Sequence, residues 1–187
     1  ADGVLNQLWK FSDLQTPFSA NMLAINGGRP EQLTLKDMLS AFNAFREEVV
    51  SKRIKHLLKK SRNRAHVLVG LAIAVANIDD VINLIRRAPS PAEAKVQLMA
   101  RDWPAKDVAP LVELIADPRH KVSDNGTYKL SEEQASAILE LRLARLTALG
   151  RDEIGDELKK IGEEIKDFLE ILGSRERIVQ IIKDELT

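Results

Sequence analysis

The stretch TLKDMLSAFNAFREEVVSKRIKHLLKKSRNRAHVLVGLAIAVANIDDVINLIRRA, residues 34–88, decides the fold. It contains no proline and one glycine, Gly70, so nothing in it forces a helix to end. Thr34 and Asp37 have the spacing of a capping box at a helix N-terminus. Together these features predict one helix over residues 34–88, roughly 80 Å long at about 1.5 Å per residue. Apolar side chains follow in alternating steps of three and four residues, which is a heptad seam, at Leu35, Met38, Phe42, Phe45 and Val49.

A helix of this length needs a partner surface, and residues 151–187 offer one. Apolar side chains again step by four and three residues until Gly173-Ser174 breaks the pattern, at Ile154, Leu158, Ile161, Ile165, Phe168 and Leu172. The two seams predict an antiparallel coiled coil in which position i faces position 219 minus i. Residues 46–64 carry eight Lys/Arg and two Glu, a net charge of +6, and residues 155–173 carry six Asp/Glu and three Lys, a net charge of −3. Opposite charges would then meet across the pair.

The segment between the two seams, residues 89–150, is predicted to be a small helical head. Ser90 precedes Pro91 with Glu93 three residues on, and Ser131 precedes Gln134 in the same spacing, so both serines are predicted helix caps. The second of these helices is expected to cover residues 131–149, with Gly150 as its C-terminal cap. Residues 101–130 are expected to be irregular.

The helix expected over residues 131–149 has a broad apolar surface. Leu139, Leu143 and Leu146 form one stripe, and Ile138 and Leu141 widen it beyond what a single packing contact requires. One interpretation is a helix buried entirely within the head. The other is a helix with one side packed in the head and the other against a second chain, where Arg142 and Arg145 would suit an interface.

The N-terminal part, residues 1–33, is predicted to hold a short helix over residues 4–16 and a β-hairpin that turns at Asn26-Gly27-Gly28. The expected fold is therefore mainly α. It is a long antiparallel coiled-coil hairpin that carries a small globular head, preceded by a short helix and a β-hairpin. The four predicted segments are 1–33, 34–88, 89–150 and 151–187.

The composition of the chain excludes several classes of function. The chain has 187 residues with 28 Lys+Arg against 28 Asp+Glu, which argues against a uniformly basic nucleic-acid binder. It has no cysteine, so thiol nucleophiles and Cys-ligated metal sites are excluded, and a cytoplasmic location fits. No apolar run approaches the roughly 20 residues that span a bilayer, so no membrane partner is expected.

Catalytic motifs are absent from the sequence. There is no phosphate-binding glycine loop, no nucleophile elbow and no H-E-x-x-H metal motif, so neither catalytic nor metal-binding residues are predicted. His66 is interpreted as a hydrogen-bonded structural histidine. Tyr128, the sole tyrosine, is interpreted as a packing or hydrogen-bonding residue rather than a nucleophile.

The basic run KRIKHLLKKSRNR, residues 52–64, is the best candidate for a nucleic-acid contact. One interpretation is a stripe that binds DNA phosphates. The other is a solvated helix face that pairs with the acidic partner helix. The residues of this possible DNA-facing stripe are Lys52, Arg53, Lys55, Lys59, Lys60, Arg62 and Arg64.

Two long segments closely resemble bacterial DNA gyrase, a type IIA topoisomerase, in its A subunit. They are RAHVLVGLAIAVANIDDVINLIRRAPSPAEAK, residues 64–95, and YKLSEEQASAILELRLARLTAL, residues 128–149. The stretch LWKFSDLQTPFSANMLAINGGRP, residues 8–30, is similar to the part of that protein that leads into its long helices. The topoisomerase IV counterpart shares this layout, but the APSPAEAK segment looks more like gyrase. Gly150-Arg151 departs from the acidic residue usual there in the family, so the resemblance leaves the exact helix junction open.

The resemblance implies a fragment that covers the end of the tower region, the coiled coil and the exit-gate (C-gate) dimerisation head. In that family two heads meet across a two-fold axis, and the transported DNA segment leaves between them. The residues that the resemblance and the apolar stripe together assign to the dimer interface are Ile138, Leu139, Leu141, Arg142, Leu143, Arg145, Leu146 and Thr147.

The resemblance also implies where the chemistry lies. The family's catalytic tyrosine and arginine belong to a domain upstream of this chain, and its Mg²⁺ and ATP bind the partner B subunit of an A2B2 complex. The fragment alone is therefore expected to bind no cofactor and to cleave no DNA, while its parent would be an ATP-dependent isomerase of DNA topology. The alternatives are a topoisomerase IV fragment from the same region and a nucleic-acid-binding helical arm that uses residues 52–64.

Overall fold

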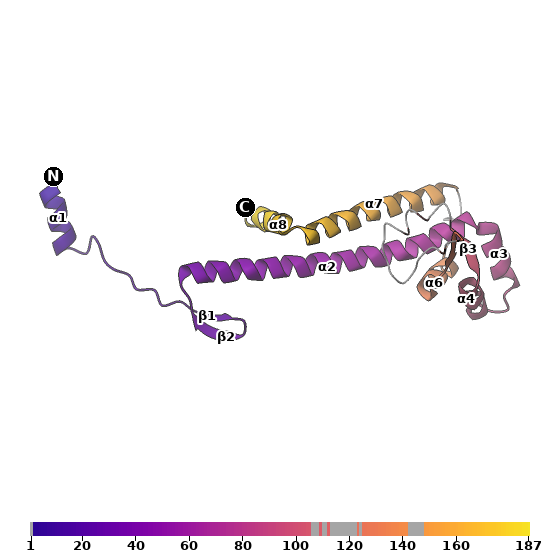
Figure 1. The fold of residues 1–187 in the computed structure, drawn as a ribbon, viewed down its shortest axis with the longest axis horizontal. Coiled ribbons are helices and arrows are strands. Elements are labelled where there is room, and N and C mark those ends of the chain that lie inside the picture. The colour runs from indigo at the N-terminus through magenta and orange to yellow at the C-terminus, as the bar shows by residue number, and fades with distance from the viewer. Residues whose placement is uncertain (1, 106–108, 110–111, 113–122, 124, 142–147) are drawn as a thin grey trace. The chain divides into compact units, whose positions relative to one another are not determined.

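A computed structural model describes residues 2–105, 109, 112, 123, 125–141 and 148–187. Within these residues the chain forms seven helices and two small antiparallel sheets, so the expected mainly α fold is confirmed (Figure 1). The chain divides into two compact units, residues 1–46 and residues 47–187.

The first unit contains helix α1 (Asp2–Phe11) and the predicted hairpin. Strands β1 (Leu23–Asn26) and β2 (Arg29–Gln32) are antiparallel. They join at Gly27 and Gly28, whose φ angles of 57° and 83° lie in the left-handed region that a tight hairpin turn requires. α1 ends at Phe11, five residues earlier than expected from the sequence.

Helix α2 (Leu35–Ala76) starts in the first unit and continues into the second. Its N-terminus is capped as predicted, because Thr34 N–H donates to Asp37 Oδ2 and Asp37 N–H donates to Thr34 Oγ1, both at 3.2 Å. The first half of the predicted seam is not covered, since Leu35, Phe42 and Phe45 are exposed.

The expectation of one helix over residues 34–88 is wrong at its C-terminal end. α2 stops at Ala76, and α3 (Ile78–Arg87) leaves it at an angle of 90°. Asn77 supplies the physical reason: its side-chain Nδ2 donates to the carbonyls of Ile73, at 2.9 Å, and Pro104, at 3.1 Å. An asparagine side chain that bonds backbone carbonyls competes with the helical ladder, and here it fixes the turn.

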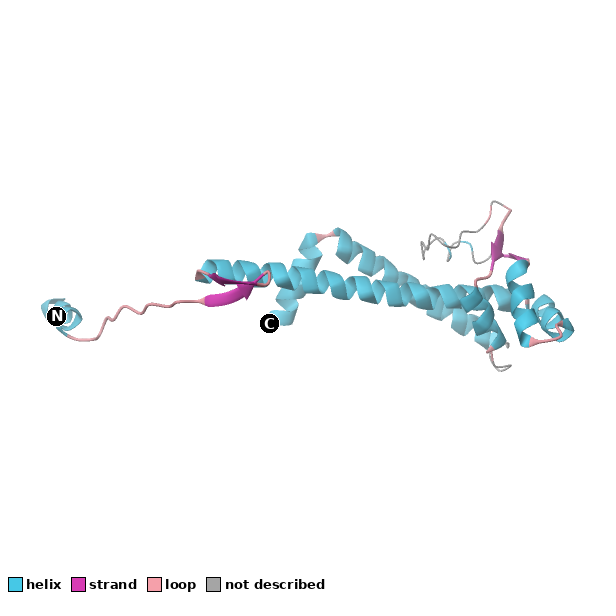
Figure 2. Ribbon diagram, turned by 90° about the horizontal axis from the view of Figure 1, so that it is seen from below, coloured by secondary structure: helices cyan, strands magenta, loops and turns pink. Residues whose placement is uncertain are grey.

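Helix α7 (Ala148–Gly173) runs back along α2 within the second unit (Figures 1 and 2). Its predicted seam is confirmed, since Ile154, Leu158, Ile161 and Ile165 are buried in the main core. On α2 the buried partners include Leu58, Ala65, Leu68 and Val69. In the predicted register the numbers of two facing residues add up to 219. Arg64 bonds Glu157 and Ser61 bonds Glu164, whose numbers add up to 221 and 225, so the observed register differs from the predicted one by two to six residues.

Helix α8 (Arg175–Leu186) follows a break at Ser174, where the sequence predicted one. Ser174 Oγ accepts from Arg177 N–H at 3.4 Å and caps the new helix. α8 crosses α2 instead of continuing α7 (Figure 2), since Arg175 bonds Glu47 while Glu185, ten residues later, bonds Arg53. A second, smaller core holds this crossing: Val50, Ile54, Ile171, Ile178 and Ile182.

The head contains α4 (Pro91–Ala100), β3 (Asp102–Pro104), β4 (Thr127–Lys129) and α6 (Glu132–Leu139). Ser90 caps α4 as expected, because its Oγ accepts from Glu93 N–H at 3.2 Å. The β3–β4 pairing sets Trp103 opposite Tyr128, and both side chains are buried. Trp103 Nε1 donates to Leu98 O at 2.9 Å, which satisfies its one polar group. The sequence predicted no strands here.

In the described part of the chain, no helix taken singly has the length and apolarity needed to cross a membrane. α2 and α3 meet that test of length and composition only together, as a pair with the 90° bend between them.

The α2–α7 seam should dominate the stability of the second unit. Ile165 is fully buried, so Ile165→Ala removes apolar contacts and leaves a cavity, and we expect a loss of about 2–4 kcal/mol in unfolding free energy. Leu169, four residues on, is 42% exposed, and Leu169→Ala should cost less than about 1 kcal/mol. Urea denaturation followed by helical circular dichroism measures both. Equal losses in the two variants would contradict the observed seam.

Candidate dimerisation surface and basic face

Helix α6 begins with a complete capping box. Ser131 N–H donates to Gln134 Oε1 at 2.9 Å, and Gln134 N–H donates to Ser131 Oγ at 3.2 Å. Two of the unpaired donors at the helix N-terminus are thereby satisfied by side chains of the same turn. The box was predicted from the sequence, and it fixes where α6 starts.

The same residues join α6 to α2. Gln134 is fully buried, and its Nε2 donates to the carbonyl of His66, at 2.7 Å, and to Tyr128 Oη, at 3.0 Å. His66 Nε2 lies 2.8 Å from Ser131 Oγ. All four polar side chains that meet here are thus hydrogen-bonded, as buried polar groups generally are. The structural roles predicted for His66 and Tyr128 are confirmed.

Gly70 makes this contact possible. A Cβ atom at Gly70 would lie 2.6 Å from Gln134 Cγ and 2.7 Å from its Cβ, far inside van der Waals contact. Gln134 therefore occupies the space that a side chain at position 70 would fill. We call this contact, formed by His66, Gly70, Tyr128, Ser131 and Gln134, the α6 seat.

The α6 seat was not predicted from the sequence, although one signal for it was present. Gly70 lies within an otherwise uninterrupted helical pattern, where a glycine is unfavourable and often marks a close approach by another part of the chain. Which side chain approaches could not be derived, because Gln134 is 64 residues away along the chain.

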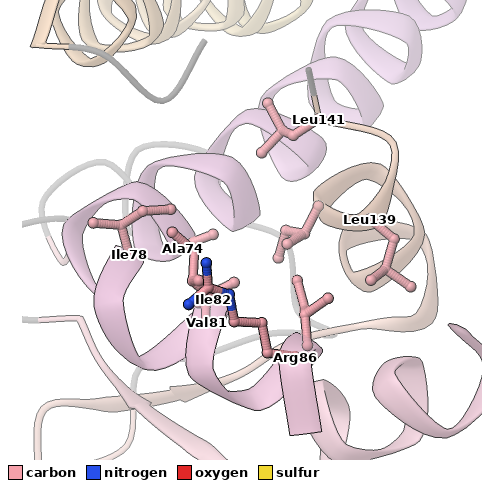
Figure 3. A pocket seen from close by; sticks show the side chains of 9 residues that line it. Ala74, Ile78, Val81, Ile82, Arg86, Leu139 and Leu141 are labelled. Atoms are coloured by element: carbon pink, nitrogen blue, oxygen red, sulfur yellow. The ribbon is translucent and has the colours of Figure 1, made fainter. Parts of the chain in front are cut away.

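Beyond the seat, α6 carries the first residues of the predicted dimer interface. Ile138 is buried, whereas Leu139 and Leu141 are half-buried and pack on the edge of the main core. They border a hollow of about 230 Å³ that α3 lines from the other side, and apart from Arg86 its lining side chains are apolar (Figure 3). Its remaining lining residues are Ala74, Ile78, Val81, Ile82, Ile85 and Arg86.

The expectation of a single helix over residues 131–149 is wrong. α6 ends at Leu139, because Leu141 N–H bonds the carbonyl three residues back, on Ile138, at 3.2 Å and so tightens the last turn. Gly150 does not close this helix; it lies inside α7. Five predicted interface residues fall outside the described residues: Arg142, Leu143, Arg145, Leu146 and Thr147.

Ion pairs divide the predicted basic stripe into three residues that bond a carboxylate and four that do not bond one among the described residues. Arg53 is paired with Glu185, and Arg64 with Glu157, through Nε at 2.9 Å and Nη2 at 2.7 Å. Lys52 is paired with Glu48 of its own helix at 2.6 Å. The remaining four make no ion pair with any described residue: Lys55, Lys59, Lys60 and Arg62. Three of these are exposed, and Arg62 is half-buried with its Nε unsatisfied.

Charge pairing also fixes α8. Arg175 donates through Nε and Nη2 to both carboxylate oxygens of Glu47, at 3.1 and 2.9 Å. These hydrogen bonds lower the pKa of Glu47, and the bond from Lys52 does the same for the pKa of Glu48. Opposite charges therefore meet between the helices as predicted, but only on part of the hairpin surface. At Glu47–Arg175 the acid lies on α2 and the base on its partner helix, which is the reverse of the prediction.

No cluster of three or more His, Asp or Glu that could hold a metal ion occurs among the residues that the structure describes. Tyr128 is buried, and its hydroxyl accepts a hydrogen bond from Gln134, so it is not presented to a substrate.

Comparison with known proteins places the whole chain in one family. A family model described as the A subunit of DNA gyrase/topoisomerase IV matches residues 1–187. The DNA gyrase A subunit of Granulibacter bethesdensis is 50% identical over 185 residues, which is 99% of this chain and 20% of that protein. The same subunit of Rickettsia bellii is 46% identical over 186 residues, and that of Salmonella typhimurium is 46% identical over 192 residues. The chain spans about a fifth of the length of these curated relatives.

The α6 seat predicts opposite effects of one substitution at two glycines. Gly70→Ala would force Gln134 out of its place, so we expect a loss of about 1–3 kcal/mol in unfolding free energy despite alanine's better helix propensity. Gly155→Ala is the matched control, because nothing lies within 4 Å of a Cβ there and α7 should gain up to about 1 kcal/mol. Urea denaturation of both variants tests this, and a stabilised Gly70→Ala protein would refute the seat.

Proposed function

The chain belongs to the family of DNA gyrase and topoisomerase IV A subunits, and on that premise we propose that it is the dimerisation and exit-gate module of a gyrase. In this role the head of one chain meets the head of a second across a two-fold axis. The transported DNA duplex leaves between the two heads when they part.

The observation that carries the proposal is the position of α6. The helix is fixed to α2 through hydrogen bonds on one side, while Leu139 and Leu141 are only half-buried beyond the seat. Partly exposed apolar side chains on a rigidly held element are typical of an interface that must form reproducibly. The apolar hollow beside them adds surface that a second copy could fill.

The hairpin suits the mechanical part of this role. α2 and α7 bury a continuous apolar seam, and the crossing α8 closes its far end with a core of its own. A stalk held in this way transmits displacement along its length instead of bending. A gate that also has to open requires a moderate interface, of about 1,000–2,000 Å² in total.

The parent protein would perform the chemistry. We propose that it is an ATP-dependent type II topoisomerase that passes one DNA duplex through another, with Mg²⁺ and ATP on a B subunit in an A2B2 complex in the cytoplasm. Gyrase is favoured over topoisomerase IV because the three relatives described above all belong to DNA gyrases. The fragment itself contributes mechanics and no catalytic group.

The apolar residues just after α6 should decide whether the chain dimerises. We expect Leu143→Asp or Leu146→Asp to weaken self-association at least about 30-fold, because an unpaired charge in an apolar interface costs about 2 kcal/mol or more. Analytical ultracentrifugation over a concentration series measures the change. The wild-type chain should sediment as a dimer.

Val96→Asp provides the control for this experiment. Val96 is an apolar residue of α4 that is 61% exposed and is not among the predicted interface residues, so its replacement should leave the dimer intact. A wild-type chain that is monomeric at all concentrations would support a purely structural stalk. Dimers unchanged in both leucine variants would remove this surface from the interface.

A further inference from the structure

We propose that one side of the α2–α7 hairpin binds the phosphates of duplex DNA, through Lys55, Lys59 and Arg62 of α2 together with Lys159 and Lys166 of α7. We call this side the basic face. The inference deepens the proposed function and rests on it for the identity of the DNA, which would be the segment that passes the hairpin on its way out.

The two sides of the hairpin differ because the ion pairs between its helices lie on one of them. Arg64 meets Glu157 across the two helices, and Ser61 meets Glu164 on the same side. α8 covers this side farther along, where Arg53 bonds Glu185. We call it the paired side, and its two arginines, Arg53 and Arg64, are already neutralised by the chain's own carboxylates.

Helical periodicity places the five cations of the basic face on the other side. At about 100° per residue, Arg62 lies about 160° around α2 from Arg64, and Lys159 lies about 160° around α7 from Glu157. Since the helices are antiparallel, both rotations lead to the side opposite the Arg64–Glu157 pair. Lys55 and Lys59 share the direction of Arg62 on α2, and Lys166, seven residues after Lys159, shares its direction on α7.

These five cations are poorly neutralised. Lys55, Lys59, Arg62 and Lys166 make no ion pair with a described residue, and Lys159 lies 4.0 Å from Asp156, with both side chains largely exposed. Such an exposed pair contributes little. Periodicity places Glu48 and Glu170 toward this side as well. Both are partly engaged, since Glu48 holds Lys52 at 2.6 Å and Glu170 lies 3.8 Å from Arg177. Glu163 remains at the outer edge of α7.

The dimensions suit a phosphate backbone. Lys55 to Arg62 and Lys159 to Lys166 each span seven residues, about 10 Å of helix, and packed helices lie about 8–10 Å apart. The five cations thus form a compact patch that several consecutive phosphates of a duplex could contact. Because the chain as a whole is neutral, binding should be weak and local, which a passing segment requires.

The test compares two double variants with the same loss of charge. Lys59→Gln/Lys159→Gln removes one cation of the basic face from each helix. Lys60→Gln/Lys160→Gln, one residue on in both helices, removes two exposed lysines that periodicity places toward the paired side. Fluorescence anisotropy with a labelled duplex of mixed sequence, titrated over a range of salt concentrations, gives the affinity and its salt dependence for the 187-residue chain.

The wild-type chain should bind the duplex at low salt with a log–log salt slope of about −4 to −5, since each phosphate contact contributes about −0.9. Lys59→Gln/Lys159→Gln should reduce the magnitude of the slope by about 2, and Lys60→Gln/Lys160→Gln should leave it unchanged. Equal losses in both variants would overturn the basic face, as would no binding of the wild-type chain at low salt. Binding to anionic lipid vesicles but not to the duplex would overturn the choice of DNA as the partner.

The same variants separate this inference from the proposed function. Neither pair of lysines lies in the head, so sedimentation should show an unchanged dimer in both. A dimer that binds no DNA would refute the basic face and leave the gate, and a monomer that binds DNA through this face would do the reverse.

Discussion

A helix of 42 residues persists in water only where another apolar surface covers it, and this constraint organises the second unit of the chain. From Val50 onward most apolar side chains of α2 are covered by α8, by α7 and by the head in turn. The crossing helix and the head thus attach at the two ends of this covered part of α2, the first through the smaller core and the second through the main core. Residues that interrupt this helix or approach it closely, such as Gly70 and Asn77, consequently determine where the other elements attach.

Patterns that depend on neighbouring residues could be predicted from the sequence. Three such features are present in the structure: the seam of α7, the hairpin turn at Gly27-Gly28 and the cap at Ser131. Each depends on residues that lie only a few positions apart in the sequence. The 90° bend could not be predicted in this way, because Asn77 turns the chain by a bond to Pro104, 27 residues away. The early end of α6 and the crossing of α8 likewise follow from contacts made in the folded chain.

The predicted dimer interface and the basic run could also be found from the sequence only in part. The apolar stripe predicted for residues 131–149 indicated an interface, yet the attachment of α6 depends on a glutamine that meets a glycine of another helix. The basic run indicated a charged face, but the sequence did not show that Arg53 and Arg64 are neutralised while Lys55 and Lys59 are not. A net charge of zero therefore conceals two unlike sides of one hairpin, because a sum over the chain does not record where each charge is directed.

The α6 seat makes the long helix a lever arm. Gln134 holds the head at Gly70, and α2 extends from there to Glu47, where Arg175 fastens α8, a distance of about 35 Å along the axis. A small tilt of the head about the seat is therefore magnified at the far end in proportion to that length. Conversely, a force applied where α8 crosses acts on the head with a mechanical advantage, so a modest push far from α6 could separate its contacts one after another.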